Sequence, residues 1–98
     1  MEQPAAIQCL TAIAHDGRLS LVRRLIQCGP PGISSGDLAK AENINASTAS
    51  AQLLVLSNSG LVRSHRRGKR MIYVADFDRF QRLISFLMED CCTGVRDE

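Results

Sequence analysis

Residues 33–74 decide the fold, and they read ISSGDLAKAENINASTASAQLLVLSNSGLVRSHRRGKRMIYV. Ser34 and Ser35 can cap a short helix, in whose first turn Asp37 suits the positive end of the helix dipole. After a turn, a second helix is predicted over about 46–58, and Gly60 stops it. Two short helices joined by a tight turn indicate a helix-turn-helix.

A basic hairpin is predicted directly after these helices. Residues 61–65 and 71–74 have the character of short strands around the sequence Arg66-Arg67-Gly68-Lys69, in which Gly68 supplies the positive φ of a tight hairpin. No Asp or Glu occurs between Asn43 and Ala75, and the stretch has a formal charge of +5, against −3 for the rest of a chain whose total is +2. Charge segregated in this way predicts a polyanion bound at one face.

The flanking segments predict three further helices. Apolar residues at helical spacing give a first helix over about 5–14 and a second with Leu19 and Val22 in its stripe, ended by residues 29–32. Asp76 can cap a last helix, which is expected to end near residues 91–94. The predicted fold is mainly α with a small β-hairpin wing, a winged helix-turn-helix in the order α-α-α-α-β-β-α.

Length and composition fit one small domain spanning residues 1–98. The chain is 45% hydrophobic and 22% charged, which is ordinary for a soluble protein. The N-terminus has no basic region leading into an apolar one, and no apolar run approaches the ~18 residues that span a bilayer. We therefore expect a cytoplasmic protein with no membrane partner, in which the four cysteines are free thiols or ligands rather than disulfides.

The helix at 46–58 has the composition of a recognition helix. Its start must enter a major groove about 12 Å wide, where short polar side chains fit. The candidates for contacts with bases or phosphates are Asn45, Ser47, Thr48, Ser50 and Gln52. The hairpin can follow the neighbouring phosphate backbone or minor groove through Arg63, His65, Arg66, Arg67, Lys69 and Arg70.

Duplex DNA is the predicted polyanion. Tyr73 is the only aromatic residue of the region, so the stacking platform used for single strands is missing. Taken separately, the helix and the hairpin would read as solvated surface elements. Their adjacency, with no acidic residue interleaved, indicates nucleic-acid binding instead.

Several motifs resemble those of the ArsR/SmtB family of winged-helix repressors. They are LAK at 38–40, STAS at 47–50, LLVL at 53–56, GLV at 60–62 and RRGKR at 66–70 with Tyr73. The resemblance covers about residues 6–92. It implies a helix-turn-helix over 34–60, a wing over 61–75, and a homodimer whose interface is formed by the first and last helices, within 1–28 and 76–92. It also implies a palindromic operator and release by a metal or metalloid.

The chain departs from the family pattern at three places. Family members often carry a basic residue or His where this chain has Ala51-Gln52. The cysteine motif common on the third helix is missing, because residues 35–41 contain no thiol. The Asp/His zinc set of the last helix is missing too, since the only histidines are His15 and His65.

The candidate effector ligands are thiols. Cys91 and Cys92 are adjacent, and although neighbours on a regular helix point about 100° apart, at a fraying end they can converge. Soft ions such as As(III) or Sb(III) favour thiolates and would be satisfied by three sulfurs. The third could be Cys9, because the resemblance places the first helix at the interface, although Cys9 also reads as a core residue. Zinc is not expected, since four N/S ligands are hard to assemble, and Cys28 is expected to be packed.

Three functions are alternatives to a repressor released by a metalloid. A thiol-based redox or reactive-sulfur repressor would keep the DNA-binding half and change only the trigger. A small thiol enzyme would need a phosphate-cradling loop with five residues between Cys and Arg, but only four separate Cys91 from Arg96, so no catalytic residue is predicted. A constitutive DNA-binding module would respond to no thiol reagent.

Overall fold

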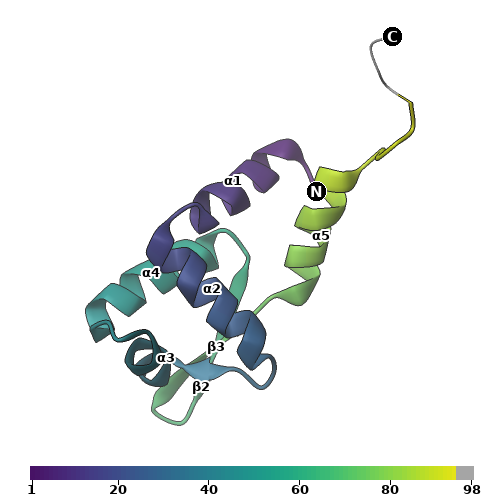
Figure 1. Cartoon of the computed structure of the whole chain (residues 1–98). Helices are drawn as coiled ribbons and strands as arrows, with labels where there is room; N and C mark the ends of the chain where they lie inside the picture. The colour runs from purple at the N-terminus through teal and green to yellow at the C-terminus, as the bar shows by residue number, and fades with distance from the viewer. Residues whose placement is uncertain (95–98) are drawn as a thin grey trace.

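The computed structural model describes residues 1–94, and Figure 1 shows how their helices and strands are arranged. Within these residues the chain order is α1 (Gln3–Ile13), α2 (Asp16–Cys28), β1 (Ile33–Ser34), α3 (Ser35–Glu42), α4 (Ala46–Asn58), β2 (Val62–Arg67), β3 (Arg70–Ala75) and α5 (Phe77–Met88). The predicted fold class, mainly α with a β-hairpin wing, is confirmed. Residues 95–98, and with them Arg96 and the end of the predicted domain, lie outside the described residues.

Side-chain caps fix where the helices begin. The His15 imidazole caps α2, where its Nδ1 accepts a hydrogen bond from the Arg18 N–H at 3.2 Å, so α2 starts earlier than its apolar stripe indicates. Of the two predicted caps of α3, Ser34 is confirmed and accepts from the Asp37 N–H at 3.1 Å, whereas Ser35 is the first residue of the helix. The predicted cap of α5 is also confirmed, because the Asp76 carboxylate accepts from the Arg79 N–H.

The three strands form an antiparallel sheet in the order β1-β3-β2. In the hairpin, Arg67 pairs with Arg70 and leaves a two-residue turn in which Gly68 has a φ of 63°, as predicted. The predicted order lacked β1. Ile33–Ser34 is too short to show an alternating pattern, and it is a strand only because it pairs with β3.

The core is built from aliphatic side chains of all five helices and the wing. Its buried members are Ala6, Cys9, Ala12, Leu21, Val22, Leu25, Leu38, Leu53, Leu56, Leu61, Val62, Ala75 and Leu83. Each fully buried leucine contributes about 1.5–3 kcal/mol of transfer free energy. This core holds α3 and the turn of the hairpin at one end of the molecule, away from α1 and α5, and α4 runs between the two ends and packs against α1 (Figure 1).

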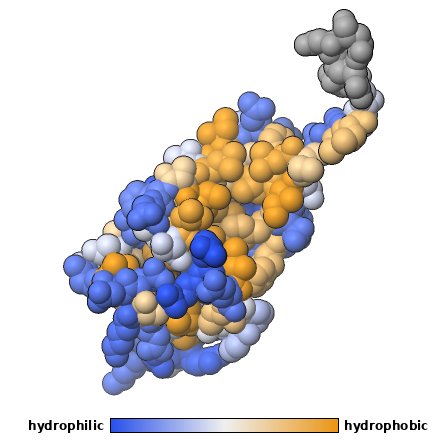
Figure 2. Space-filling view, viewed as in Figure 1, coloured by the Kyte–Doolittle hydropathy of each residue, from blue (hydrophilic) through white to orange (hydrophobic). Residues whose placement is uncertain are grey.

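An apolar surface remains exposed over α1 and α5. We call it the α1/α5 patch, and it consists of Ile7, Leu10, Ile84, Leu87 and Met88, whose exposed fractions run from 37% to 58%. Figure 2 shows the apolar surface in the upper half of the molecule and a hydrophilic surface in the lower half. A contiguous exposed apolar patch marks an interaction site. No helix among residues 1–94 has the length and apolar character needed to cross a membrane.

The last helix is shorter than predicted. It was expected to reach Cys91-Cys92, but it ends at Met88. Asp90 and Cys92 have φ values of 60° and 65°, which a right-handed helix cannot accommodate. The two cysteines therefore lie in a turn that follows the helix.

Candidate functional site

The start of α4 is organised by Asn45. Its amide oxygen accepts a hydrogen bond from the Thr48 N–H at 2.8 Å and another from the Ser47 hydroxyl at 2.9 Å. Asn45 is therefore the N-cap of the recognition helix. It was predicted to contact bases or phosphates, and the structure shows that its side chain also caps a helix, a role that its position directly before α4 could have signalled.

Gln52 is tied to the second helix. It is half-buried, and its Oε1 accepts a hydrogen bond from an Arg18 guanidinium nitrogen at 2.9 Å. The Nε of Arg18 also donates to the carbonyl of Ala12 at the end of α1. Gln52 thus faces α2, whereas Thr48 and Ser50 are exposed on the first turns of α4.

The wing presents its cations to solvent. Every β2 residue after Val62 is exposed, which includes Arg63 and His65. Arg63 lies 3.7 Å from a carboxylate oxygen of Asp76. Arg66, Arg67 and Lys69 are exposed as well, and among residues 1–94 they form no ion pair with a carboxylate.

Arg70, next to the turn of the wing, connects the wing to α3. One guanidinium nitrogen donates to the Ser34 hydroxyl and to the Asp37 carboxylate, each at 2.7 Å. The hydrogen bond and charge of Arg70, with a further hydrogen bond from Ser34, hold the pKa of the Asp37 carboxyl below its ordinary value. Arg70 was predicted to contact DNA, and the structure gives it two partners within the fold.

The cysteine pair is brought together after α5. The Sγ atoms of Cys91 and Cys92 lie 3.1 Å apart, and both residues are exposed. The hydrogen bond with Cys92, together with slight desolvation, raises the pKa of the Cys91 thiol above its ordinary value. The predicted convergence is present, although a turn rather than a fraying helix produces it.

The other two thiols lie elsewhere. Cys9 is fully buried, and its thiol donates to the Ser59 carbonyl at 3.3 Å, so its position in the core is confirmed. Among the described residues no group of three or more His, Cys, Asp or Glu side chains could hold a metal ion. Cys28 was expected to be packed, which is wrong: it is exposed at the end of α2, and its thiol donates to the Gly32 carbonyl at 3.5 Å.

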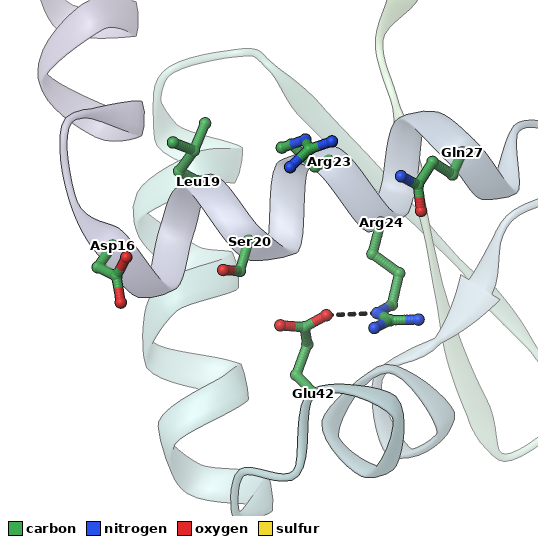
Figure 3. A pocket seen from close by; sticks show the side chains of 7 residues that line it. All are labelled: Asp16, Leu19, Ser20, Arg23, Arg24, Gln27 and Glu42. Carbon is green, nitrogen blue, oxygen red and sulfur yellow. Dashed lines mark hydrogen bonds and ion pairs between the residues drawn. The ribbon is translucent and has the colours of Figure 1, made fainter.

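A hollow of about 390 Å³ lies along α2 (Figure 3). Arg24 and Glu42 point toward each other across it and form an ion pair that ties the end of α3 to α2. Arg23 and Asp16 also line the hollow, so its charges cancel. We assign this hollow a structural role, because it lacks the single sign of charge that attracts an ionic ligand.

An exposed helix start beside a basic wing, carried by a helix-turn-helix, defines a winged-helix DNA-binding protein. The chain is 32% identical over 91 residues to the HTH-type transcriptional regulator YgaV of Escherichia coli (strain K12), which covers 93% of this chain and 88% of YgaV. The chain belongs to the ArsR/SmtB family of winged-helix transcriptional regulators, as its motifs predicted. Regulators of this kind are not enzymes. No family model matches the chain.

Two solved structures illustrate the likeness. The transcriptional repressor BigR from Xylella fastidiosa is 30% identical, with a TM-score of 0.66 over 88% of this chain and 85% of BigR. The homodimeric winged helix-turn-helix DNA-binding domain of Mb0332 from Mycobacterium bovis, fragment 1–100, has a TM-score of 0.72. It is 23% identical and covers 97% of this chain and 88% of that fragment, a likeness of fold.

Proposed function

We propose that this protein is a homodimeric repressor that binds palindromic operator DNA and releases it when a thiophilic effector binds Cys91 and Cys92. The observation that carries the DNA-binding half is the exposed start of α4 beside the exposed cations of the wing. Thr48 and Ser50 would reach base edges in the major groove, and Arg66, Arg67 and Lys69 would contact phosphates.

DNA binding is tested by separating these two roles. Arg66→Ala should weaken binding to all duplexes and lower the slope of log K against log salt by about 0.9, whereas Ser50→Ala should change sequence preference. Arg23→Ala, an exposed arginine of α2, is the matched control and should change neither. If Arg66→Ala and Ser50→Ala behaved alike in a fluorescence-anisotropy titration, the assignment of roles would be wrong.

The α1/α5 patch supports the homodimer. A two-fold contact between copies of this patch would bury its exposed side chains and set the two recognition helices at a fixed spacing, which on DNA corresponds to half-sites about 34–36 Å apart. Leu87→Glu places a charge in the patch and should yield a monomer in sedimentation equilibrium. Gln27→Glu adds the same charge at an exposed position of α2, outside the patch, and should leave a dimer. A dimeric Leu87→Glu would exclude this interface.

The effector site is proposed on the Cys91–Cys92 pair. Trivalent arsenic or antimony is the effector we favour, because soft ions prefer sulfur and the two Sγ atoms are already adjacent and exposed. Condensation of arsenous acid with two thiols forms two As–S bonds and releases two water molecules. The pair follows Leu87 and Met88 of the α1/α5 patch, so a ligand there would act on the dimer contact.

Cys9 would have to leave the core to serve as a third ligand. Its thiol is fully buried and donates to Ser59, so we propose that the third position is taken by hydroxide or an external thiol. Arsenite should therefore protect two thiols of the wild type from a thiol-specific reagent, and none in the Cys91→Ser/Cys92→Ser variant. The exposed thiol of Cys28, which both proteins share, is the internal reference. Cys9→Ser should leave arsenite affinity unchanged, and a tenfold loss would restore Cys9 as a ligand.

Oxidation of the same pair is the second candidate, favoured by the 3.1 Å separation of the sulfurs. Two thiols would lose two protons and two electrons to hydrogen peroxide, which becomes two water molecules, and one S–S bond would form. Mass spectrometry would then show the loss of two hydrogen atoms together with release of DNA. Release by peroxide and not by arsenite would replace the metalloid proposal with this one.

A further inference from the structure

A second hollow, of about 310 Å³, lies between α3 and the wing. Residues 34–37 and Lys40 line one side, and residues 69–71 line the other. We call it the α3/wing hollow. It lies at the end of the molecule that carries α3 and the hairpin, away from α1 and α5 (Figure 1).

The α3/wing hollow is cationic. Its lining holds Lys40, Lys69, Arg70 and one carboxylate, that of Asp37, which leaves a formal charge of +2. Arg70 is paired with Asp37, so the carboxylate is neutralised within the fold. Lys40 and Lys69 are exposed, and among residues 1–94 neither forms an ion pair.

We infer that the α3/wing hollow binds a phosphate of the DNA backbone, held by Lys40 from α3 and Lys69 from the wing. This inference rests on the proposed function, because the phosphate belongs to the operator duplex. Two lysines from separate elements, both lining one hollow beside a basic wing, provide the point charges that a phosphodiester requires. Arg70 is a positioning residue here, since its bonds to Ser34 and Asp37 keep the two walls together.

The site has a consequence for recognition. A phosphate held between α3 and the wing fixes both elements against one point of the DNA backbone, and contacts of this kind set the register of a recognition helix without reading sequence. Lys40 lies outside the acid-free stretch, between Asp37 and Glu42, so charge patterning alone does not single it out.

The test measures the salt dependence of binding. Lys40→Gln, Lys69→Gln and the control Arg23→Gln are titrated by fluorescence anisotropy against operator and scrambled duplexes, from about 50 to about 200 mM chloride. Each lysine variant should lower the slope of log K against log salt by about 0.9 and weaken both duplexes to the same extent. Arg23→Gln should match the wild type. Circular dichroism melting checks that all three variants fold.

The outcomes separate this site from the proposed function. If Lys40→Gln keeps the wild-type slope of log K against log salt while Arg66→Ala lowers it, the hollow holds no phosphate and the proposal of DNA binding stands. If the wild type binds no duplex, the proposed function fails and this site fails with it. If inorganic phosphate displaces DNA from the wild type more than chloride of equal ionic strength, and this excess disappears in Lys40→Gln, free phosphate competes with the DNA for this site and the backbone assignment is supported.

Discussion

Replacing Asn45 by alanine distinguishes a helix cap from a base-reading residue. The Asn45 side chain accepts hydrogen bonds from the Thr48 N–H at 2.8 Å and the Ser47 hydroxyl at 2.9 Å, and Asn45→Ala removes both. Loss of an N-cap costs about 1 kcal/mol of unfolding free energy. Because Asn45 is exposed, water can replace part of the lost hydrogen bonding, so the expected loss of unfolding free energy stays near about 1 kcal/mol.

For a domain of this size, about 1 kcal/mol corresponds to a fall of about 4–8 °C in the melting midpoint. The assay is thermal and urea unfolding followed by circular dichroism, at one protein concentration because dimerisation contributes to stability. Asn45→Ser keeps a capping acceptor and should lie within about 0.5 kcal/mol of the wild type.

Asn45→Asp is the informative companion variant. It keeps the acceptor and adds a negative charge at the start of α4, so stability should be retained or raised. The same charge would face DNA phosphates, so operator affinity should fall, most strongly at low salt. If Asn45→Ala kept full stability but lost sequence preference, the side chain would be a base reader and the capping argument would be wrong.

Three further predictions concern the fold. Leu53→Ala, at a fully buried position, should cost about 2–5 kcal/mol in urea unfolding, whereas its exposed neighbour Leu54→Ala should change stability by less than about 0.5 kcal/mol; equal costs would contradict the burial assignment. Glu42→Gln breaks a partly exposed ion pair with Arg24 and should lower the unfolding free energy by up to about 1 kcal/mol. A gain in stability would show that this ion pair does not stabilise the contact between α2 and α3. Because Arg70 lowers the pKa of Asp37 in the folded state, their ion pair stabilises the fold above pH 3.8, the ordinary pKa, and this stabilisation is lost as the pH falls through the lowered pKa. Asp37→Asn should therefore reduce the loss of unfolding free energy at acid pH. An unchanged loss would show that the Asp37–Arg70 pair does not contribute to stability.

Much of the fold could be predicted from local sequence. The acid-free stretch from Asn43 to Ala75, the positive φ of Gly68 and the caps Ser34 and Asp76 are properties of neighbouring residues, and the structure contains each of them. β1 was not predicted, because it is a strand only through its pairing with β3, nearly forty residues later.

The side-chain roles in the site were harder to predict. Gln52 has a polar side chain on a recognition helix, but its partner is Arg18, 34 residues earlier. Arg70 is one cation in a basic run, yet its partners Ser34 on β1 and Asp37 on α3 lie 36 and 33 residues earlier. The sequence shows which groups are present, whereas tertiary pairing decides which of them remain available to DNA.

The end of α5, directly before the thiol site, also could not be predicted from local sequence. The sequence places two adjacent cysteines after an apolar stripe, and helical geometry alone would direct them apart. The helix ends where Glu89 adopts a ψ of 134°, and the positive φ values of Asp90 and Cys92 follow in a turn where the sulfurs lie 3.1 Å apart. A turn of this kind has no strong local signature, because Asp and Cys occur in many other contexts.

The proposal that a thiol pair controls DNA release is tested most directly by one titration. Wild type and the Cys91→Ser/Cys92→Ser variant are bound to fluorescent duplex from the upstream region, and arsenite is added while anisotropy is recorded. We predict that the wild type is released and that the variant, which starts with the same affinity, stays bound. Release of both proteins to the same extent, or retention of both, would contradict control by Cys91 and Cys92.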